Sequence, residues 1–453
     1  MDTRNALHLY PGLVLHHLQV RYAKLVLVAG LATHSVVMAM VVVSAAALAG
    51  CGGGGGADSG QPPVAAGNGN PAADPAPPAP PSSPPAIPQS STPNVQPIAV
   101  NALPTRTRNM LTTSVTVCAP STNDCATIDN VQVDTGSSGL RILASALPAS
   151  LDLPAVAGAG GAAGAGTISG SCGVFGSGYT WGAVRTADVR MAGQIAAALP
   201  IQVIADPTLP AVPTDCANSG PPMMSPATLR VNGILGIGLF STDCGSACTR
   251  NALPRWYYTC VSGGTCTPGS QPLTSQVGNP VADFAENNNG VIIELPAIPD
   301  AGAQSVTGQL IFGIGTQANN TLGGATVIRT NTQTGRIVTS ADGQTWPNSF
   351  IDSGSNGMFF ATTLAQCGLW YCPPSGATLS ATMTGTDGAA ITLSFPVGNA
   401  QALLASTNNA FDNLAGPSNT MFDWGLPFFF GRRVYTAIEA RATAAGDGPY
   451  YAF

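Results

Sequence analysis

The chain contains the same short motif twice, and this repeat constrains its fold more than any other feature. The copies read VQVDTGSSGLRI at residues 131–142 and SFIDSGSNGMFF at residues 349–360. Each has an apolar run, then Asp-[Thr/Ser]-Gly-Ser, then apolar residues again. Short apolar runs of this kind are typical of buried strands. The repeat therefore predicts two strands that each deliver an aspartate, Asp134 or Asp352, to a sharp turn.

The turns after these aspartates hold residues suited to a polar site. Gly136 and Gly354 let the backbone turn without a Cβ clash. Hydroxyl groups close to each aspartate in sequence can hydrogen-bond a carboxylate or the opposite loop. These hydroxyls belong to Thr135, Ser137, Ser353 and Ser355. If the two turns face each other, both carboxylates cannot ionise easily, so the pair holds one proton. Such a pair offers an acid and a base at one site.

Composition favours short strands over helices. The 453 residues include 54 Gly and 38 Pro, and only 8% are charged. Because Gly and Pro interrupt helices, we expect an all-β protein with many short strands and turns. The net charge is −6, and no run of basic residues occurs outside the first fifty residues. Nucleic acid is therefore excluded as an expected partner.

Histidine and lysine occur only in the first fifty residues, as His8, His16, His17, His34 and Lys24. The chain from residue 51 onward therefore cannot use Ser-His-Asp or Cys-His catalysis, His-bound zinc or a Schiff-base lysine. Glutamate occurs only as Glu286, Glu294 and Glu439. Any acid–base chemistry thus falls mainly to aspartates, and we expect no metal and no organic cofactor.

Residues 1–50 have the parts of a signal peptide of lipoprotein type. Arg21 and Lys24 precede an apolar run that ends in Leu-Ala-Gly-Cys at residues 48–51. This ending resembles the lipobox of bacterial lipoproteins. It implies lipidation of Cys51 and a lipid-anchored location in the bacterial cell envelope, at the outer membrane or facing the periplasm. The alternative is an uncleaved membrane helix, because about 25 apolar residues can span a bilayer.

A Gly/Pro/Ala-rich segment follows at residues 51–97. It opens with a glycine run and continues mostly with Pro, Ala, Ser and Gly. Such a composition buries too little apolar surface to fold, so we expect a disordered tether. The folded part is then expected to begin near residue 98.

The ten cysteines after Cys51 form an even number in an exported chain, where disulfides persist. Spacing does not fix their connectivity, but it suggests four local pairs and one longer pair. These are Cys118–Cys125, Cys244–Cys248, Cys260–Cys266, Cys367–Cys372 and Cys172–Cys216. We expect five disulfides and no metal bound at these residues.

The chain resembles the pepsin-like aspartic proteases along most of its folded part. Beside the two aspartate motifs, six further segments follow in the family's order. They are 174–182 and 188–193 (flap hairpin and following strand), 232–239 (apolar-apolar-Gly motif of the first lobe), 308–315 (opening of the second lobe), 423–430 (its Gly motif) and 433–439 (closing strand). The resemblance is to a bacterial lipoprotein branch rather than to the secreted digestive enzymes.

This resemblance implies a bilobal, all-β fold with the active-site cleft between the lobes. The N-terminal lobe would span residues 98–305 and the C-terminal lobe residues 306–453. Asp134 and Asp352 would be the catalytic pair that shares a proton, as in the aspartic-protease dyad. The flap over the substrate would comprise Phe175, Gly176, Ser177 and Gly178. The expected function is a membrane-anchored, monomeric endopeptidase acting on peptides or proteins.

Some positions depart from the family pattern. Phe175 stands where the flap usually carries Tyr, and Arg141 stands where the family often has an aromatic residue. The segment from Cys244 to Cys266 has the character of an insertion. These departures leave open an alternative function, a catalytically inactive surface module that binds peptide or protein. A third hypothesis is a structural lipoprotein in which the aspartate loops contribute only to packing.

Aspartates outside the two motifs receive no role in this chemistry. Asp188, Asp283, Asp300 and Asp423 are expected at surface or structural positions. The catalytic prediction therefore rests on two aspartates alone.

Overall fold

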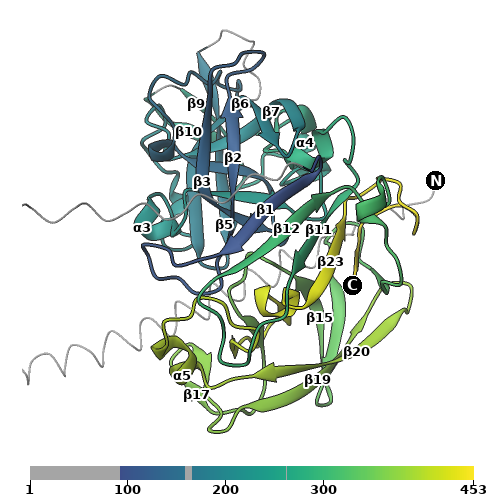
Figure 1. Ribbon diagram of the computed structural model, residues 1–453. Helices are drawn as coiled ribbons and strands as arrows, with labels where there is room; N and C mark the ends of the chain where they lie inside the picture. The colour runs from purple at the N-terminus through teal and green to yellow at the C-terminus, as the bar shows by residue number, and fades with distance from the viewer. Residues whose placement is uncertain (1–91, 159–165, 262) are drawn as a thin grey trace, which may run out of the picture. The chain divides into compact units, whose positions relative to one another are not determined.

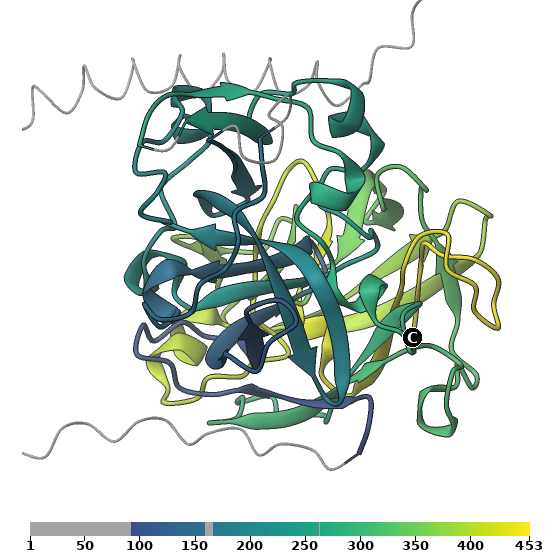
Figure 2. The ribbon, with the colours of Figure 1, turned by 90° about the horizontal axis from the view of Figure 1, so that it is seen from above.

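The computed structural model describes residues 92–158, 166–261 and 263–453, which belong to one compact unit of the chain. The predicted signal peptide, Cys51 and nearly all of the tether lie outside the described residues. Figures 1 and 2 show strands throughout, joined by loops and very short helices. The predicted all-β class is confirmed. None of the described helices is long and apolar enough to cross a membrane.

Short helices occur only between strands in the described residues. The α-helices are α2 (Thr214–Ala217), α3 (Pro226–Leu229), α4 (Ser246–Arg250) and α5 (Ala400–Ala405). The 3-10 turns are η1 (Ala144–Ala146), η2 (Leu273–Ser275), η3 (Pro280–Asp283), η4 (Ala318–Asn320) and η5 (Leu426–Phe429). None exceeds six residues, as expected where Gly and Pro recur.

Fifteen of the described strands form one continuous sheet. In spatial order they are β10 (Cys266–Pro268), β9 (Tyr257–Val261), β5 (Thr167–Phe175), β6 (Gly178–Met191), β7 (Gln194–Ile204), β4 (Ser138–Leu143), β8 (Gly233–Ile237), β3 (Cys125–Asp134), β2 (Leu111–Cys118), β1 (Val95–Val100), β12 (Val306–Phe312), β11 (Gly290–Leu295), β23 (Arg432–Ala437), β24 (Tyr450–Ala452) and β13 (Val327–Arg329). Figure 1 shows β1, β12, β11 and β23 side by side. The predicted lobe boundary at residues 305 and 306 falls between β11 and β12, which pair with each other.

Seven other described strands form a second sheet. In order they are β20 (Ala390–Val397), β19 (Ala377–Thr384), β14 (Ile337–Ala341), β15 (Gln344–Ile351), β22 (Asp423–Trp424), β16 (Met358–Phe360) and β21 (Ala415–Pro417). A separate hairpin joins β17 (Gln366–Cys367) to β18 (Trp370–Tyr371). Aromatic rings fill the core behind the second sheet, where Phe422 stacks on both Phe360 and Trp424. This packing holds β15, β16 and β22 together.

The predicted end of the tether at residue 97 is wrong, because β1 already begins at Val95. This strand pairs antiparallel with β12, with Val95 opposite Ile311 and Pro97 opposite Gln309. Val95 and Ile98 are both buried. Burial of these apolar side chains in the sheet orders a segment that its Pro content alone predicts to be disordered. The folded part therefore includes at least residues 95–97.

The two aspartate strands have matching surroundings. β3 runs parallel to β8, and β4 returns antiparallel to it. In the second half, β15 runs parallel to β22, and β16 is antiparallel to it. A Cβ on Gly236 would lie 2.8 Å from Ser137 Oγ, and one on Gly425 only 2.0 Å from the Gly357 carbonyl oxygen. Each partner strand therefore needs its glycine to pass this close to an aspartate loop.

All five predicted disulfides are confirmed. The pairs are Cys118–Cys125, Cys172–Cys216, Cys244–Cys248, Cys260–Cys266 and Cys367–Cys372. Five disulfides in one chain are typical of oxidising compartments and indicate an extracytoplasmic protein.

Candidate active site

The two predicted aspartate loops meet through reciprocal hydrogen bonds. The Thr135 amide donates to Ser353 Oγ (3.1 Å), and the Ser353 amide donates to Thr135 Oγ1 (2.9 Å). Each hydroxyl also donates to a backbone carbonyl in the strand that precedes the other aspartate, Thr135 to Ile351 (3.2 Å) and Ser353 to Val133 (2.8 Å). Both side chains are buried, so these four bonds fix the position of one loop against the other.

This junction brings the two carboxyl groups together. The Gly136 amide lies 2.8 Å from Asp134 Oδ1 and 3.1 Å from Asp352 Oδ1, so one N–H faces both groups. A Cβ on Gly354 would lie 2.6 Å from Asp134 Oδ1, which leaves room only for glycine. The sequence separates these residues widely, and the fold places them at one point.

Each aspartate has its own serine three residues later. Ser137 Oγ donates to Asp134 Oδ2 (2.5 Å), and Ser355 Oγ lies 2.8 Å from Asp352 Oδ2. Backbone amides support the other oxygens, with Gly354 N–H donating to Asp352 Oδ1 (2.7 Å). The predicted supporting residues are therefore all in contact with the aspartates or with the opposite loop.

The pair differs in exposure and in protonation. Asp134 is 6% exposed, whereas Asp352 is only half-buried and the neighbouring Gly136 is exposed. Burial, together with the charge of Asp352, raises the pKa of Asp134 to about 8, although the Ser137 hydroxyl acts in the opposite direction. The shared proton therefore resides on Asp134 at acid and neutral pH. Asp352 is the carboxylate that solvent reaches.

A third carboxyl group, Asp423, lies in the site, and the sequence prediction of a surface or structural role missed it. Asp423 Oδ2 is 2.6 Å from Ser355 Oγ, the same hydroxyl that contacts Asp352. The side chain is 5% exposed. Burial and the charge of Asp352 raise the pKa of Asp423 well above its ordinary value. A signal was present, because an acidic residue replaces an apolar one in the motif that contains Ile234 in the first half.

The predicted flap forms a hairpin. β5 ends at Phe175 and β6 begins at Gly178, with Gly176 and Ser177 at the turn. Ser177 Oγ contacts Met223 Sδ at 3.1 Å, and both Gly176 and Ser177 are exposed. The Phe175 ring lies over the Arg141 guanidinium, 5.5 Å from its carbon. The hairpin thus joins the first aspartate loop through Arg141.

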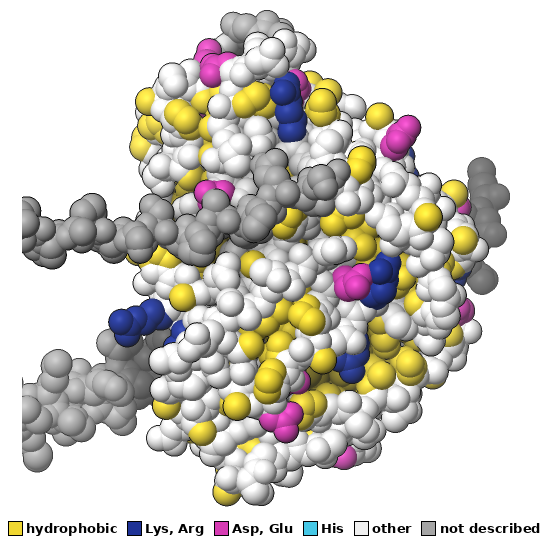
Figure 3. Space-filling view, in the orientation of Figure 1, with side chains coloured by type: hydrophobic (Ala, Val, Ile, Leu, Met, Phe, Trp, Pro, Cys, Tyr) yellow, Lys and Arg dark blue, Asp and Glu magenta, His cyan; other side chains and the backbone are white. Residues whose placement is uncertain are grey.

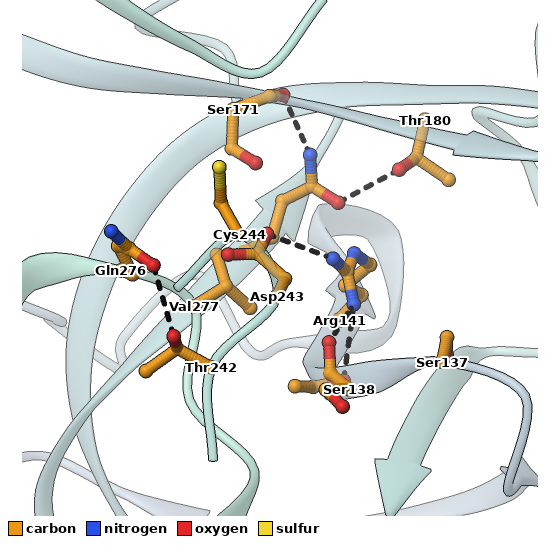
Figure 4. Close-up of polar contacts among 12 residues, drawn as sticks. Ser137, Ser138, Arg141, Ser171, Thr180, Thr242, Asp243, Cys244, Gln276 and Val277 are labelled. Atoms are coloured by element: carbon orange, nitrogen blue, oxygen red, sulfur yellow. Dashed lines mark hydrogen bonds and ion pairs between the residues drawn. The ribbon is translucent and has the colours of Figure 1, made fainter. Parts of the chain in front are cut away.

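Arg141 is a buried cation close behind this loop, at 3% exposure. Its guanidinium donates to the Ser138 carbonyl (2.8 Å) and pairs with Asp243 at 3.0 Å, as Figure 4 shows. The Tyr257 hydroxyl also donates to Asp243. Burial raises the pKa of Asp243 to about 6, despite the opposing influence of Arg141 and Tyr257. The predicted insertion, Cys244 to Cys266, supplies Tyr257, which lies on β9 beside β5.

No group of three or more His, Cys, Asp or Glu side chains within the described residues could hold a metal ion. One hollow of about 870 Å³ is bordered by Glu294 and Arg433, and neither Asp134 nor Asp352 lines it. On the face drawn in Figure 3, charged side chains are few and scattered.

Residues 90–453 match the model of a family described as "Protein of unknown function (DUF3443)". The chain belongs to this family. No curated protein matches the chain. Among solved structures, the chain is similar to an aspartic proteinase from Irpex lacteus, with a TM-score of 0.45 and 15% identity over 79% of this chain and 96% of that one. A likeness at this level says nothing about activity in this DUF3443 protein, whose chemistry must be argued from its own contacts.

Proposed function

We propose that this DUF3443 protein is an aspartic-type endopeptidase. The observation that carries the proposal is the pair Asp134 and Asp352, whose carboxyl oxygens both face the Gly136 amide. Asp134 holds a proton at acid and neutral pH, and Asp352 is open to solvent. One acid and one base at the same point suit the activation of water.

The proposed reaction uses the two groups in opposite senses. Asp352 takes a proton from a water molecule, whose oxygen attacks the carbonyl carbon of a peptide bond. Asp134 donates its proton to the developing oxyanion, which gives a gem-diol. Asp352 then passes the proton it took from water to the departing nitrogen, and one diol hydroxyl returns a proton to Asp134 as the C–N bond breaks, so that a carboxylic acid and an amine result. The Gly136 amide faces both carboxyl groups and keeps them close together for these proton transfers.

We also propose that the protein is attached to a bacterial envelope membrane by a lipid on Cys51. The support is the Leu-Ala-Gly-Cys sequence at the end of the apolar run. The substrate, a peptide or protein, would then be met outside the cytoplasm, and the enzyme would act as a monomer.

Peptide-library cleavage by the purified exported protein across pH 3 to 9 tests the proposed activity. Asp134→Asn and Asp352→Asn should each lower the rate by a factor of about 10² to 10⁴, because each removes a proton-transfer group. Asp387→Asn, in an exposed turn, is the matched control and should cleave normally. Full activity in either site variant, or no cleavage by the unaltered protein at any pH, would reject the peptidase and favour the binding module.

A further inference from the structure

The two halves differ at one position in the strand that runs beside each aspartate strand. In the first half, Ile234 lies opposite Gln132, two residues before Asp134. In the second half, Asp423 lies opposite Phe350, two residues before Asp352. Both side chains are buried, at 3% and 5% exposure. At equivalent positions, the second half therefore has the carboxyl group of Asp423 and the first half has the aliphatic side chain of Ile234.

The contacts of Ser355 decide the state of this carboxyl group. Its Oγ lies 2.8 Å from Asp352 Oδ2 and 2.6 Å from Asp423 Oδ2. A hydroxyl has one proton, so it can donate to one of these oxygens only and must accept a hydrogen bond from the other group. A protonated Asp423 satisfies both contacts, since it donates to Ser355 and Ser355 donates to Asp352. Two ionised carboxylates would leave one contact without a proton.

The charges around Asp423 agree with a neutral carboxyl group. Asp352, Asp134, Arg336 and Tyr451 are the titratable groups that act on this region. Arg336 is the only cation among them. One cation can balance one negative charge, so protons on two of the three carboxyl groups leave the region close to neutral. Asp423 Oδ1 is buried without a hydrogen-bond partner among the described residues, which would be costly for an ionised carboxylate.

We propose that Asp423 is a positioning residue that, while protonated, orients the Ser355 hydroxyl toward Asp352 and so keeps Asp352 as the base of the pair. The inference rests on the proposed peptidase function. When Asp423 loses its proton, the Ser355 hydroxyl is drawn toward the new carboxylate and Asp352 gains a negative neighbour. The first half has no such control, because Ile234 cannot donate to Ser137.

The first test compares pH–rate profiles of the exported protein for three substitutions. Asp423→Leu removes the donor and should lower kcat/KM about tenfold at pH 5, mainly through kcat. Asp423→Asn should recover most of that loss, because its amide donates to Ser355 without being able to ionise. Its activity should also persist to higher pH. Asp283→Asn, which alters an exposed aspartate outside the site, should leave the profile unchanged.

Ser355 must carry the effect. In a Ser355→Ala background, Asp423→Leu should add little further loss, since the connection to Asp352 is already broken. Additive losses would overturn the proposal. So would a wild-type profile in Asp423→Leu, or an Asp423→Asn variant as impaired as the leucine variant.

A second readout does not depend on cleavage. Because the pKa of Asp423 is raised in the folded protein, its contribution to stability is complete at low pH and is lost as pH rises. The thermal midpoint of Asp423→Asn should therefore gain several degrees relative to the unaltered protein between pH 4 and pH 8. If the difference in thermal midpoint between Asp423→Asn and the unaltered protein stays constant from pH 4 to pH 8, the proposal is overturned, even if the protein is an active peptidase. A growing difference without any cleavage supports the protonated Asp423 and rejects the peptidase alone.

Discussion

The loops of Asp134 and Asp352 are near copies in backbone and unlike in surroundings. Each follows a strand that pairs in parallel with a second strand, and in each loop a hydroxyl accepts a hydrogen bond from a backbone amide of the other loop. The first is packed against a buried ion pair, Arg141 with Asp243. The second contacts a third carboxyl group, Asp423. The comparison teaches that a repeated motif sets where two carboxyl groups meet, whereas their neighbours set which one keeps the proton.

The largest expected effect concerns that proton. The pKa of Asp134, about 8 in the folded protein, exceeds its ordinary 3.8 because of burial and the charge of Asp352. The folded state therefore binds this proton more tightly, and the stabilisation is complete below about pH 4 and lost as pH rises toward 8. The free energy of unfolding should fall by about 1.4 kcal/mol per pH unit from this group, and Asp134→Asn should remove that slope.

Chemical denaturation at several pH values checks this asymmetry between the loops. Asp352→Asn should reduce the slope only in part, because burial of Asp134, the main cause of its raised pKa, remains. Asp387→Asn, exposed and distant in sequence, should keep the full slope. An unchanged slope in Asp134→Asn would contradict the assignment of the proton to the first loop.

A smaller effect is expected from the buried cation of the first half. Arg141 stands seven residues after Asp134, where the second half has Phe359, packed against Trp370. Arg141→Met leaves Asp243 buried without its cation and should lower the free energy of unfolding by about 3–5 kcal/mol. Adding Asp243→Leu should restore much of the loss, because the unpaired charge is then gone.

Equilibrium unfolding at pH 7 measures both variants, above the pKa of about 6 of Asp243. Phe359→Met provides the matched substitution in the second half and should cost less, since it leaves no charge unpaired. If Arg141→Met lowers the free energy of unfolding by less than about 1 kcal/mol, the ion pair does not make the first half differ in stability from the second.

The smallest effect tests what the loops share. Thr135→Val leaves the buried Ser353 amide without an acceptor, and Ser353→Ala does the same to the Thr135 amide. Each should cost about 1–3 kcal/mol of unfolding free energy. The double variant should cost less than the sum, because the bonds are reciprocal. Strictly additive losses would show that the two loops are held independently.

Sequence predicted the features that depend on local pattern. The all-β class, the two aspartate turns and five disulfides follow from composition, apolar runs, glycines and cysteine spacing, whereas the flap hairpin follows from the family resemblance, and all are present. These features need only neighbouring residues to specify them.

Sequence did not predict the features that depend on distant neighbours. The exchange of an apolar residue for Asp423 is visible in the sequence, but its contact with Ser355 arises only because β22 lies beside β15. Pro97 argued for disorder, and only pairing with a strand more than 200 residues later orders β1. The joint burial of Arg141 and Asp243 likewise requires β4 and the region after β8 to be packed together. In each case the deciding contact joins segments that no local window contains.

The position of β1 has a mechanical consequence. The chain that precedes it is the part through which any anchor would pull. β1 lies inside the larger sheet, between β2 and β12, and not at its edge. In an antiparallel pair the hydrogen bonds are perpendicular to the strands, so a pull along β1 loads the ladder to β12 in shear. The bonds must then fail together rather than one after another, and tension on the N-terminal side is borne by the centre of the fold.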